Sequence, residues 1–568
     1  MRSKFLYFIL ILFSSYITVS GSPLSNKWML QSVLITNNDD TICYNCFEIS
    51  SEVDSLVLHK DKTFRYQIID ANKYAIGTWK YLDSRLYLSY FEPHDTLRDY
   101  HVTLTDTSLL LLESNQGVKK QFFYSPYEVK YDIQKSEGFT FTSLFRGFLG
   151  IVLLLLISVL LSRNRKAINW SMVIKGLLLQ FIIAILILKV PFIHSIFEFL
   201  SAVFVTILDF TAEGSRFLFG SFMNTDSYGY IFAFQVLPTI IFFSAITSLL
   251  FYYGILQRIV YFFARIMKST LNLSGSESLA AAGNIFLGQT ESPLLVKPYI
   301  EKMTMSELLC LMSGGLATIA GGVLAAYIGF LGGDDYAQRM FFAQHLLMAS
   351  VMSAPAAIVA AKILLPETEK FQEDMEISQE RLGKNALESI SIGTIQGLKL
   401  AVNVGAMLLV FIALVAMINY FFDDFIGERT GLNHWIESVT NGRYDGFSLQ
   451  FILGYVFAPI SWIIGVAKED IFLVAQLLGE KTILNEFYAY TSLGSMRESG
   501  LLVNEKSIII ATYVLCGFAN LSSIGIQIGG IGSLAPNRRG DLSRLGILSL
   551  IAGTIACLFT GVIVGMIL

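Results

Sequence analysis

Gly288-Gln289-Thr290-Glu291-Ser292 is the stretch that decides how this chain folds. It lies in segment 280–296, which is otherwise apolar and rich in small residues. Pro293 interrupts this segment, and Pro298 lies just after its end. A carboxylate at membrane depth costs about 2.5–3.5 kcal/mol on insertion scales, so it normally marks a substrate or ion path. Polar, proline-broken backbone at that depth is tolerated only against a cavity or another part of the protein. We therefore expect part of a binding site inside a membrane.

The composition is that of a membrane protein. The 568 residues are 54% hydrophobic and 15% charged, with a mean hydropathy of +0.57. A spanning helix needs about 20 apolar residues, and the clearest candidates are 147–161, 174–188, 231–255, 308–331, 341–364, 401–422 and 545–568. The net charge of −4 argues against a nucleic-acid partner.

The first residues differ from the rest of the chain. Residues 1–22 place Arg2 and Lys4 before a short apolar core and small residues, the pattern of a secretory signal peptide. A signal anchor that stays attached is the alternative, and either one exports the next segment.

Residues 23–126 alternate polar and apolar positions between turn residues, which predicts a small all-β exported domain. Stretches around Trp28 and Trp79 faintly resemble lipocalin-like domains, and that similarity implies a fold at most. Cys43 and Cys46 lie here, and in an oxidising compartment they can form a disulfide. The sequence alone does not decide whether they do. Residues 127–143 form the linker to a core of 144–568.

Basic residues indicate the orientation. They follow the first and third apolar stretches and precede the last, at Arg163, Arg165, Lys166, Arg258, Arg265, Lys268, Arg538, Arg539 and Arg544. Such clusters face the cytoplasm, so the N-terminal domain and the C-terminus are expected on the periplasmic or extracellular side. This requires an even number of spans, most simply eight. Residues 196–219 contain Asp209, Glu213 and Arg216, so we expect an interfacial helix there.

The two halves of the apolar region share an order of elements. In the first half, a broken segment near 277–303 with its carboxylate precedes Gly315-Leu316-Ala317-Thr318-Ile319-Ala320-Gly321. In the second, an interrupted segment at 446–476 and Glu486 precede Gly517-Phe518-Ala519-Asn520-Leu521-Ser522-Ser523. Paired interrupted segments in corresponding positions indicate the repeats of a transporter. We therefore predict an α-helical polytopic membrane protein with inverted repeats and two re-entrant hairpins, preceded by the β domain.

Several motifs, in this order, resemble the concentrative nucleoside transporter family. They are 288–294, 353–357, 366–369, 485–487, 517–520 and 524–530, within a resemblance that runs from about residue 177 to 568. The resemblance implies a homotrimer in a bacterial-type inner (plasma) membrane that imports nucleosides with sodium by alternating access. It implies no cofactor beyond the coupling ion, and the β domain lies outside it.

The resemblance also implies a substrate site. Gln289, Thr290 and Glu291 match positions that face the nucleobase, Glu486, Asn520 and Ser523 match positions that hold the ribose, and Val323 and Phe518 match apolar positions beside them. Amide, hydroxyl and carboxylate groups supply the donors and acceptors that a base edge and a sugar need. Simpler interpretations stay open: Gln289 or Asn520 joins two helices, Glu486 is an interfacial charge, and Val323 and Phe518 pack in a core.

Sodium is the coupling ion that the resemblance implies. Asn284 and Thr318 match its side-chain ligands, and Leu287 and Ile319 match positions that donate backbone carbonyls. Hard cations prefer such oxygens, and unwound helix ends free the carbonyls. Relatives often carry serine where this chain has Thr318, which keeps the hydroxyl. Some relatives use protons instead, so a proton-coupled symporter is the alternative.

Other classes of protein fit less well. The chain has six histidines, none forming a metal-spaced pair with another, so we expect no enzyme. Cys310, Cys516 and Cys557 lie in apolar stretches as core residues do. A channel does not need two broken repeats around paired carboxylates. A nucleoside-sensing membrane receptor stays open because the domain ahead of the core is exported.

Overall fold

The computed structural model describes residues 27–37, 40–44, 55–58, 62–68, 73–82, 84–92, 96–104, 109–115, 118–126, 133–136, 138–224, 228, 231–333, 335–369, 375, 383–440, 443–444 and 446–568. The predicted signal peptide and Cys46 lie outside them, and the side chain of Cys43 is not described. The chain divides into two compact units, Met1–Tyr131 and Asp132–Leu568, here called the β unit and the helical unit.

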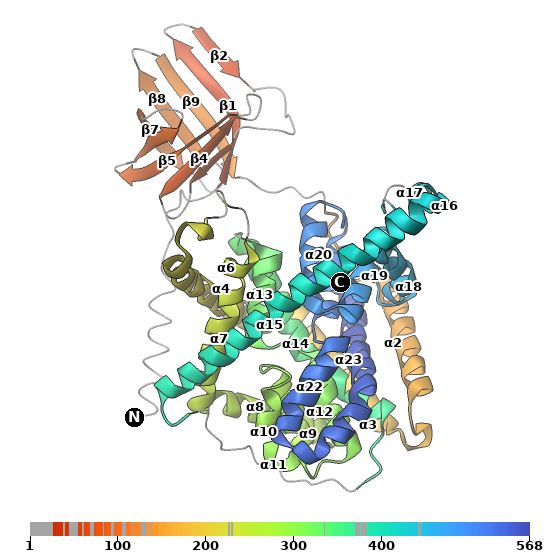
Figure 1. The fold of residues 1–568 in the computed structure, drawn as a ribbon. Helices are drawn as coiled ribbons and strands as arrows, with labels where there is room; N and C mark the ends of the chain where they lie inside the picture. The colour runs from red at the N-terminus through yellow and green to blue at the C-terminus, as the bar shows by residue number, and fades with distance from the viewer. Residues whose placement is uncertain are drawn as a thin grey trace. The chain divides into compact units, whose positions relative to one another are not determined.

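The β unit is one antiparallel sheet that closes on itself (Figure 1). Its strands are β1 (Lys27–Asn37), β2 (Asp40–Tyr44), β3 (Ser55–Leu58), β4 (Thr63–Ile68), β5 (Lys73–Leu82), β6 (Arg85–Glu92), β7 (Thr96–Leu104), β8 (Leu109–Asn115) and β9 (Val118–Pro126). In the described residues β3 to β9 pair in sequence, and β1 pairs with both β3 and β9. The ring is therefore an eight-stranded barrel, with β2 paired to the far part of β1.

The interior of the barrel follows the alternation of its strands. On β5 the buried positions are Ala75, Gly77 and Trp79, with successive residues pointing to opposite faces. Gly77 lies at a register shift, where a Cβ would stand 1.9 Å from the carbonyl oxygen of Ser89. Only glycine permits this approach of β5 to β6. The predicted β domain is thus present as a barrel.

The helical unit is a bundle of short and long helices (Figure 1). Its helices are α2 (Phe141–Leu161), α3 (Trp170–Lys189), α4 (Pro191–Phe219), α6 (Phe232–Gln235), α7 (Leu237–Tyr252), α8 (Ile255–Leu271), α9 (Gly275–Asn284), α10 (Ser292–Leu295), α11 (Lys297–Ile300), α12 (Met305–Ala317), α13 (Gly321–Gly332), α14 (Tyr336–Leu364), α15 (Ala386–Tyr420), α16 (Glu428–Thr430), α17 (Leu432–Thr440), α18 (Leu449–Ile463), α19 (Ile471–Ile483), α20 (Glu486–Glu498), α21 (Glu505–Leu515), α22 (Leu521–Leu534) and α23 (Arg539–Ile567). In the described residues, eight helical runs are long and apolar enough to cross a membrane.

One of these runs, Pro191–Met223, corrects the prediction of an interfacial helix at 196–219. The charges that suggested an interface gather toward the C-terminal end of α4 and pair there: Asp209 with Arg339 of α14 at 2.9 Å, and Glu213 with Arg216 at 2.7 Å. The interfacial pattern belongs instead to α8. Its buried residues recur on one face, whereas Arg258 and Arg265 are exposed, a division typical of helices that lie along a membrane surface.

The helices α12, α14 and α23 pack against one another and form the centre of the unit. They are mostly buried, while α2, α3, α4 and α15 leave most of their apolar side chains partly or fully exposed. Apolar side chains on the outside of a bundle are typical of helices that face lipid or another subunit.

A buried charge cluster fixes the base of α9 and α12. Both helices begin with capping boxes, in which Ser274 and Glu277 or Thr304 and Glu307 satisfy the first backbone amides. Lys362, near the C-terminal end of α14, forms an ion pair with Glu277 and donates to Ser306 Oγ at 3.0 Å.

The motif at residues 366–369 belongs to the same cluster. Glu367 lies 3.4 Å from Lys362 and accepts a hydrogen bond from Thr304 Oγ1 at 2.7 Å. The side chain of Lys362 is 7% exposed and that of Glu277 is 1% exposed. Water therefore reaches neither charge, and each depends on the other for its stabilisation.

We predict that Lys362→Met destabilises the helical unit strongly. Removing one partner of a buried pair leaves an uncompensated charge, with a loss of about 3–5 kcal/mol. The measurement is the thermal unfolding midpoint of the purified protein in detergent. Lys384→Met, at an exposed position, is the matched control and should unfold as the native protein does. Equal midpoints for the two variants would show that the cluster contributes little to stability.

Candidate functional site

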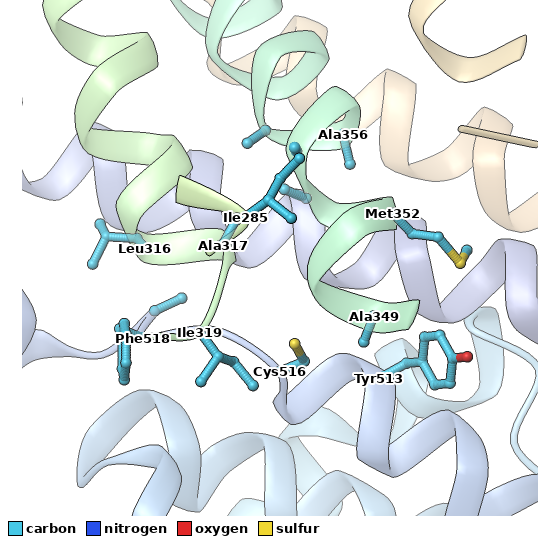
Figure 2. Packing of buried hydrophobic residues seen from close by; sticks show 14 of the residues in the cluster. Ile285, Leu316, Ala317, Ile319, Ala349, Met352, Ala356, Tyr513, Cys516 and Phe518 are labelled. Atoms are coloured by element: carbon cyan, nitrogen blue, oxygen red, sulfur yellow. The ribbon is translucent and has the colours of Figure 1, made fainter. Parts of the chain in front are cut away.

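Two helical runs break near the centre of the unit and contact each other there. The predicted span 308–331 lies within a run, Met305–Gly332, that is long and apolar enough to cross a membrane. The run is not one continuous helix, because α12 ends at Ala317 and α13 begins at Gly321. The corresponding break separates α21 from α22 and contains Gly517, whose φ is +120°. A Cβ on Gly517 would stand 2.8 Å from the carbonyl carbon and oxygen of Ala317, so glycine lets the two breaks touch. Figure 2 shows these segments with Ala317, Ile319, Cys516 and Phe518.

A third break follows α9 and carries the polar stretch at 288–292. Gly288 lies against the break between α12 and α13, since its Cβ position is 3.2 Å from Ala320 Cβ. Gly315 has no side chain, and a Cβ there would stand 2.9 Å from Gln289 Cβ and 2.8 Å from Gln527 Nε2. The polar stretch therefore lies against both α12 and α22.

A fourth break, at Leu484 and Asn485, separates α19 from α20. The range 446–476, predicted as a re-entrant hairpin, holds α18, a turn at Gly465 with φ of +99°, and the start of α19, and its re-entrant path stays a prediction. The carboxylate of Glu486 belongs to the break at Leu484 and Asn485. There the Asn485 side chain accepts a hydrogen bond from the backbone of Tyr488 at 2.8 Å and caps α20. Glu486 is thereby placed at the first position of α20.

A line of hydrogen bonds connects three of these breaks. Asn520 Nδ2 donates to Glu486 Oε2, and Asn520 Oδ1 accepts from the backbone of Ser523 at 2.9 Å, which caps α22. Gln289 Nε2 in turn donates to Ser523 Oγ at 3.3 Å. All four side chains are buried, with Glu486 only 4% exposed. Glu486 is therefore no exposed interfacial charge, while Gln289 and Asn520 do join separate segments.

The remaining predicted substrate residues lie around this line. Glu291 is half-buried and accepts from the backbone of Gly288 at 3.1 Å, so its carboxylate folds back onto its own break. Thr290 is exposed and lies against Gly530 of α22. Val323 and Phe518 are buried in the hydrophobic core, as the packing interpretation expects.

Two of the predicted sodium residues, Asn284 and Thr318, lie against Gly314. Thr318 Oγ1 donates to the carbonyl oxygen of Gly314 at 2.9 Å, and a Cβ on Gly314 would stand 2.4 Å from Asn284 Nδ2. Asn284, Thr318, Leu287 and Ile319 are at most 2% exposed. An amide oxygen and a hydroxyl, freed at the ends of α9 and α12, are ligands that suit a hard monovalent cation.

Six buried amide oxygens have no hydrogen-bond donor among the described residues, and three of them lie at or beside these breaks: Asn284 Oδ1, Gln289 Oε1 and Gln527 Oε1. The other three belong to Gln180, Gln235 and Gln257, elsewhere in the helical unit. Buried acceptors almost always have a partner, so these oxygens indicate where a ligand, an ion or water binds. Gln527 was missed in the sequence. It lies one helical turn after Ser523 on α22, and that spacing alone would have placed it on the same face.

Family models match nearly all of the helical unit. "Na+ dependent nucleoside transporter N-terminus" matches residues 149–222, "Nucleoside recognition" matches 233–334, and "Na+ dependent nucleoside transporter C-terminus" matches 345–565. An uncharacterized transporter of Haemophilus influenzae is 39% identical over 429 residues, which are 75% of this chain and 98% of that protein. This chain belongs to the sodium-dependent nucleoside transporter family.

Animal members of the family match the same part of the chain. Solute carrier family 28 member 3 of Eptatretus stoutii is 42% identical over 434 residues, or 74% of this chain, and sodium/nucleoside cotransporter 1 of Rattus norvegicus is 37% identical over 435 residues. The chain spans 60% of the length of the first protein and 63% of the second. The family therefore accounts for the helical unit of this transporter and not for its β unit.

Solved structures agree with this assignment. CNTnw in an inward-facing substrate-bound state is 36% identical, with a TM-score of 0.67, and the match covers 75% of this chain and 98% of CNTnw. Variants of CNTnw in an outward-facing state and in intermediate states match with a TM-score of 0.66.

Proposed function

We propose that this family member is a sodium-coupled symporter that imports nucleosides across the inner (plasma) membrane by alternating access. The observation that carries the proposal is the buried line from Glu486 through Asn520 and Ser523 to Gln289, which gathers a carboxylate, amides and a hydroxyl from three broken segments. The states known for CNTnw support alternating access. The two pairs of breaks support inverted repeats and re-entrant hairpins.

The two ends of the line suit the two halves of a nucleoside. Glu486 accepts hydrogen bonds from ribose hydroxyls, and such bonds to a carboxylate are of the stronger, charge-assisted kind. The second hydrogen of the Asn520 amide and the hydroxyl of Ser523 complete the sugar end. At the other end, Gln289 offers its unpaired oxygen to a base edge, with Thr290 and Glu291 beside it.

The coupling ion binds next to the substrate site. Asn284 ends α9 and Gln289 follows it within the same break, so ion binding orders the segment that faces the base. When one ligand orders a site, the second ligand binds at a smaller cost in conformational entropy. Each ligand then raises the affinity for the other by the same factor. One sodium moving down about 100 mV contributes about 2.3 kcal/mol, enough for roughly fiftyfold accumulation since about 1.4 kcal/mol is tenfold.

The outer surface of the helical unit and its basic residues support the proposed assembly and orientation. Exposed apolar side chains on α4 and α15 support contacts with lipid and with other subunits of a homotrimer. The basic clusters support a cytoplasmic position for the ends of α2 and α8. The β unit and the C-terminus then lie on the periplasmic or extracellular side.

We predict that Glu486→Gln lowers uridine uptake by proteoliposomes about tenfold to a hundredfold. The amide keeps the shape but loses the charge-assisted bonds, each of about 1.5–3 kcal/mol. Glu498→Gln, exposed at the other end of α20, is the matched control and should transport normally. Near-normal uptake by Glu486→Gln, with both variants equally well folded, would exclude Glu486 as the ribose ligand.

We predict that Asn284→Ala with Thr318→Ala weakens apparent sodium affinity first, and that uridine affinity recovers partly at saturating sodium. Thr394→Ala is the control, because Thr394 makes the same type of bond to a carbonyl one turn back on an exposed face. The measurement is uridine uptake across a sodium titration with pH clamped. Transport that ignores sodium but follows an imposed proton gradient would assign this chain to the proton-coupled branch.

We predict that the helical unit transports without the β unit. A chain beginning at residue 132 behind a fresh export signal keeps Gln134, whose backbone bonds to Val503 at 2.8 Å and to Glu505 at 3.0 Å. It should take up uridine at a rate near that of the full chain. A chain beginning at residue 138 loses these bonds and should be less stable to heat. Well-folded but inactive protein from residue 132 would make the β unit part of the transport mechanism.

A further inference from the structure

The barrel of the β unit encloses a cavity of about 320 Å³. Strands β3 to β9 all contribute to its lining. An eight-stranded barrel is just wide enough either to be filled by side chains or to hold one small ligand. Phe64, Trp79, Leu86 and Leu109 fill one part of this interior, whereas β5 presents only Ala75 to the cavity. Small-molecule pockets begin at about 300 Å³, so this space fits a small ligand.

One part of the lining is apolar. Leu56, Leu88 and Leu111 are each at most 2% exposed, and Phe122 closes the same region. Their side chains carry no hydrogen-bonding atoms, so a polar group placed among them would lose its water without replacement, at a cost of about 1–3 kcal/mol. This part therefore selects an apolar body.

Another part of the lining is cationic and aromatic. Along β7, Arg98 and Tyr100 line the cavity; Tyr100 is buried, whereas Arg98 is exposed. The Arg98 guanidinium lies 5.7 Å from the ring centroid of Tyr90. A hydrogen bond with Tyr100 raises the pKa of Arg98, so it is charged throughout. Burial raises the pKa of Tyr90 and of Tyr100, which keeps both phenols neutral.

The charge of Arg98 is available to a ligand. The carboxylate of Glu113 on β8 attracts the Arg98 guanidinium electrostatically. In the described residues, however, the two side chains form no ion pair. Glu113 lies directly opposite Lys120 of β9 in the sheet register. Opposite charges in such a cross-strand pair attract each other. Arg98 and Lys120 are positive and Glu113 is negative, so the three side chains together carry a net positive charge.

We propose that the barrel of the β unit binds a small amphipathic anion, with its apolar body among the leucines and its negative group at Arg98. Arg98 presents a planar fork of donors that matches a carboxylate or phosphate, and the Tyr100 hydroxyl stands beside it. A neutral nucleoside fits this cavity less well, because it has neither a negative group for Arg98 nor an apolar body for the leucines.

The test measures binding of radiolabelled octanoate by equilibrium dialysis to the full chain in nanodiscs, with empty nanodiscs subtracted. We expect saturable binding of one octanoate per chain. Octanol, which has the same body without the charge, should bind at least tenfold more weakly, as expected for one hydrogen bond to a charged group. Binding no greater than that of empty nanodiscs would overturn the proposal.

Variants locate the site. Arg98→Gln should weaken octanoate binding about tenfold or more and leave octanol binding unchanged. Arg85→Gln is the matched control, because Arg85 is an exposed arginine paired with Asp99 at 2.7 Å outside the cavity. Ala75→Phe should fill the space and abolish binding of both probes. If Arg98→Gln and Arg85→Gln bind octanoate equally, the anion is not held at Arg98 and the proposal fails.

A uridine arm separates this proposal from the transport function. Uridine should not displace octanoate from the native chain or from Glu486→Gln. Displacement in both proteins would mean that the barrel captures the proposed transport substrate, and the amphipathic-anion assignment would be wrong. Because transport is scored by uptake and the barrel by octanoate binding, each proposal can fail without the other.

Discussion

Breaking a helix inside an apolar interior frees backbone carbonyls and amides that must find partners, and the helical unit is organised around meeting that constraint. Its breaks are satisfied by side chains from other elements. Ser350 Oγ donates to the carbonyl of Ile285 at 2.8 Å, and Lys481 Nζ donates to that of Val514 at 2.8 Å. Segments distant in sequence are therefore locked together wherever the helical hydrogen bonds are missing.

The same constraint explains why candidate binding residues are also structural residues. Asn520 caps α22 with its oxygen and holds Glu486 with its nitrogen, so one side chain fixes both the helix end and the carboxylate. Gln527 uses its nitrogen on a broken helix and has no described donor for its oxygen. An amide suits this position because it offers donors and an acceptor at once. In the proposed ligand site, the oxygens of the Gln289 and Gln527 amides are left without a partner among the described residues.

Local patterns in the sequence correctly predicted those elements that are determined by residues close to one another in the chain. Alternation predicted the β strands, glycine and polar residues marked the breaks, and both Glu486 and Asn520 were placed at them. Patterns failed where tertiary contacts decide. The charges of α4 suggested an interface, but Arg339 of another helix pairs with Asp209. The re-entrant hairpins near 277–303 and 446–476 stay predictions. The inverted relation of the two halves stays a prediction.

The unpaired oxygens also suggest why the proposed ion and substrate bind together. A buried acceptor without a donor carries a penalty of about 1–3 kcal/mol. Asn284 and Gln289 carry two such oxygens within one break, so the free energy of that segment depends on which ligands occupy both sites. A cation at Asn284 removes one penalty and fixes the backbone between them, which leaves Gln289 aimed at the base. Coupling on this mechanism needs no path through the rest of the protein, because the two ligands share a single unwound segment.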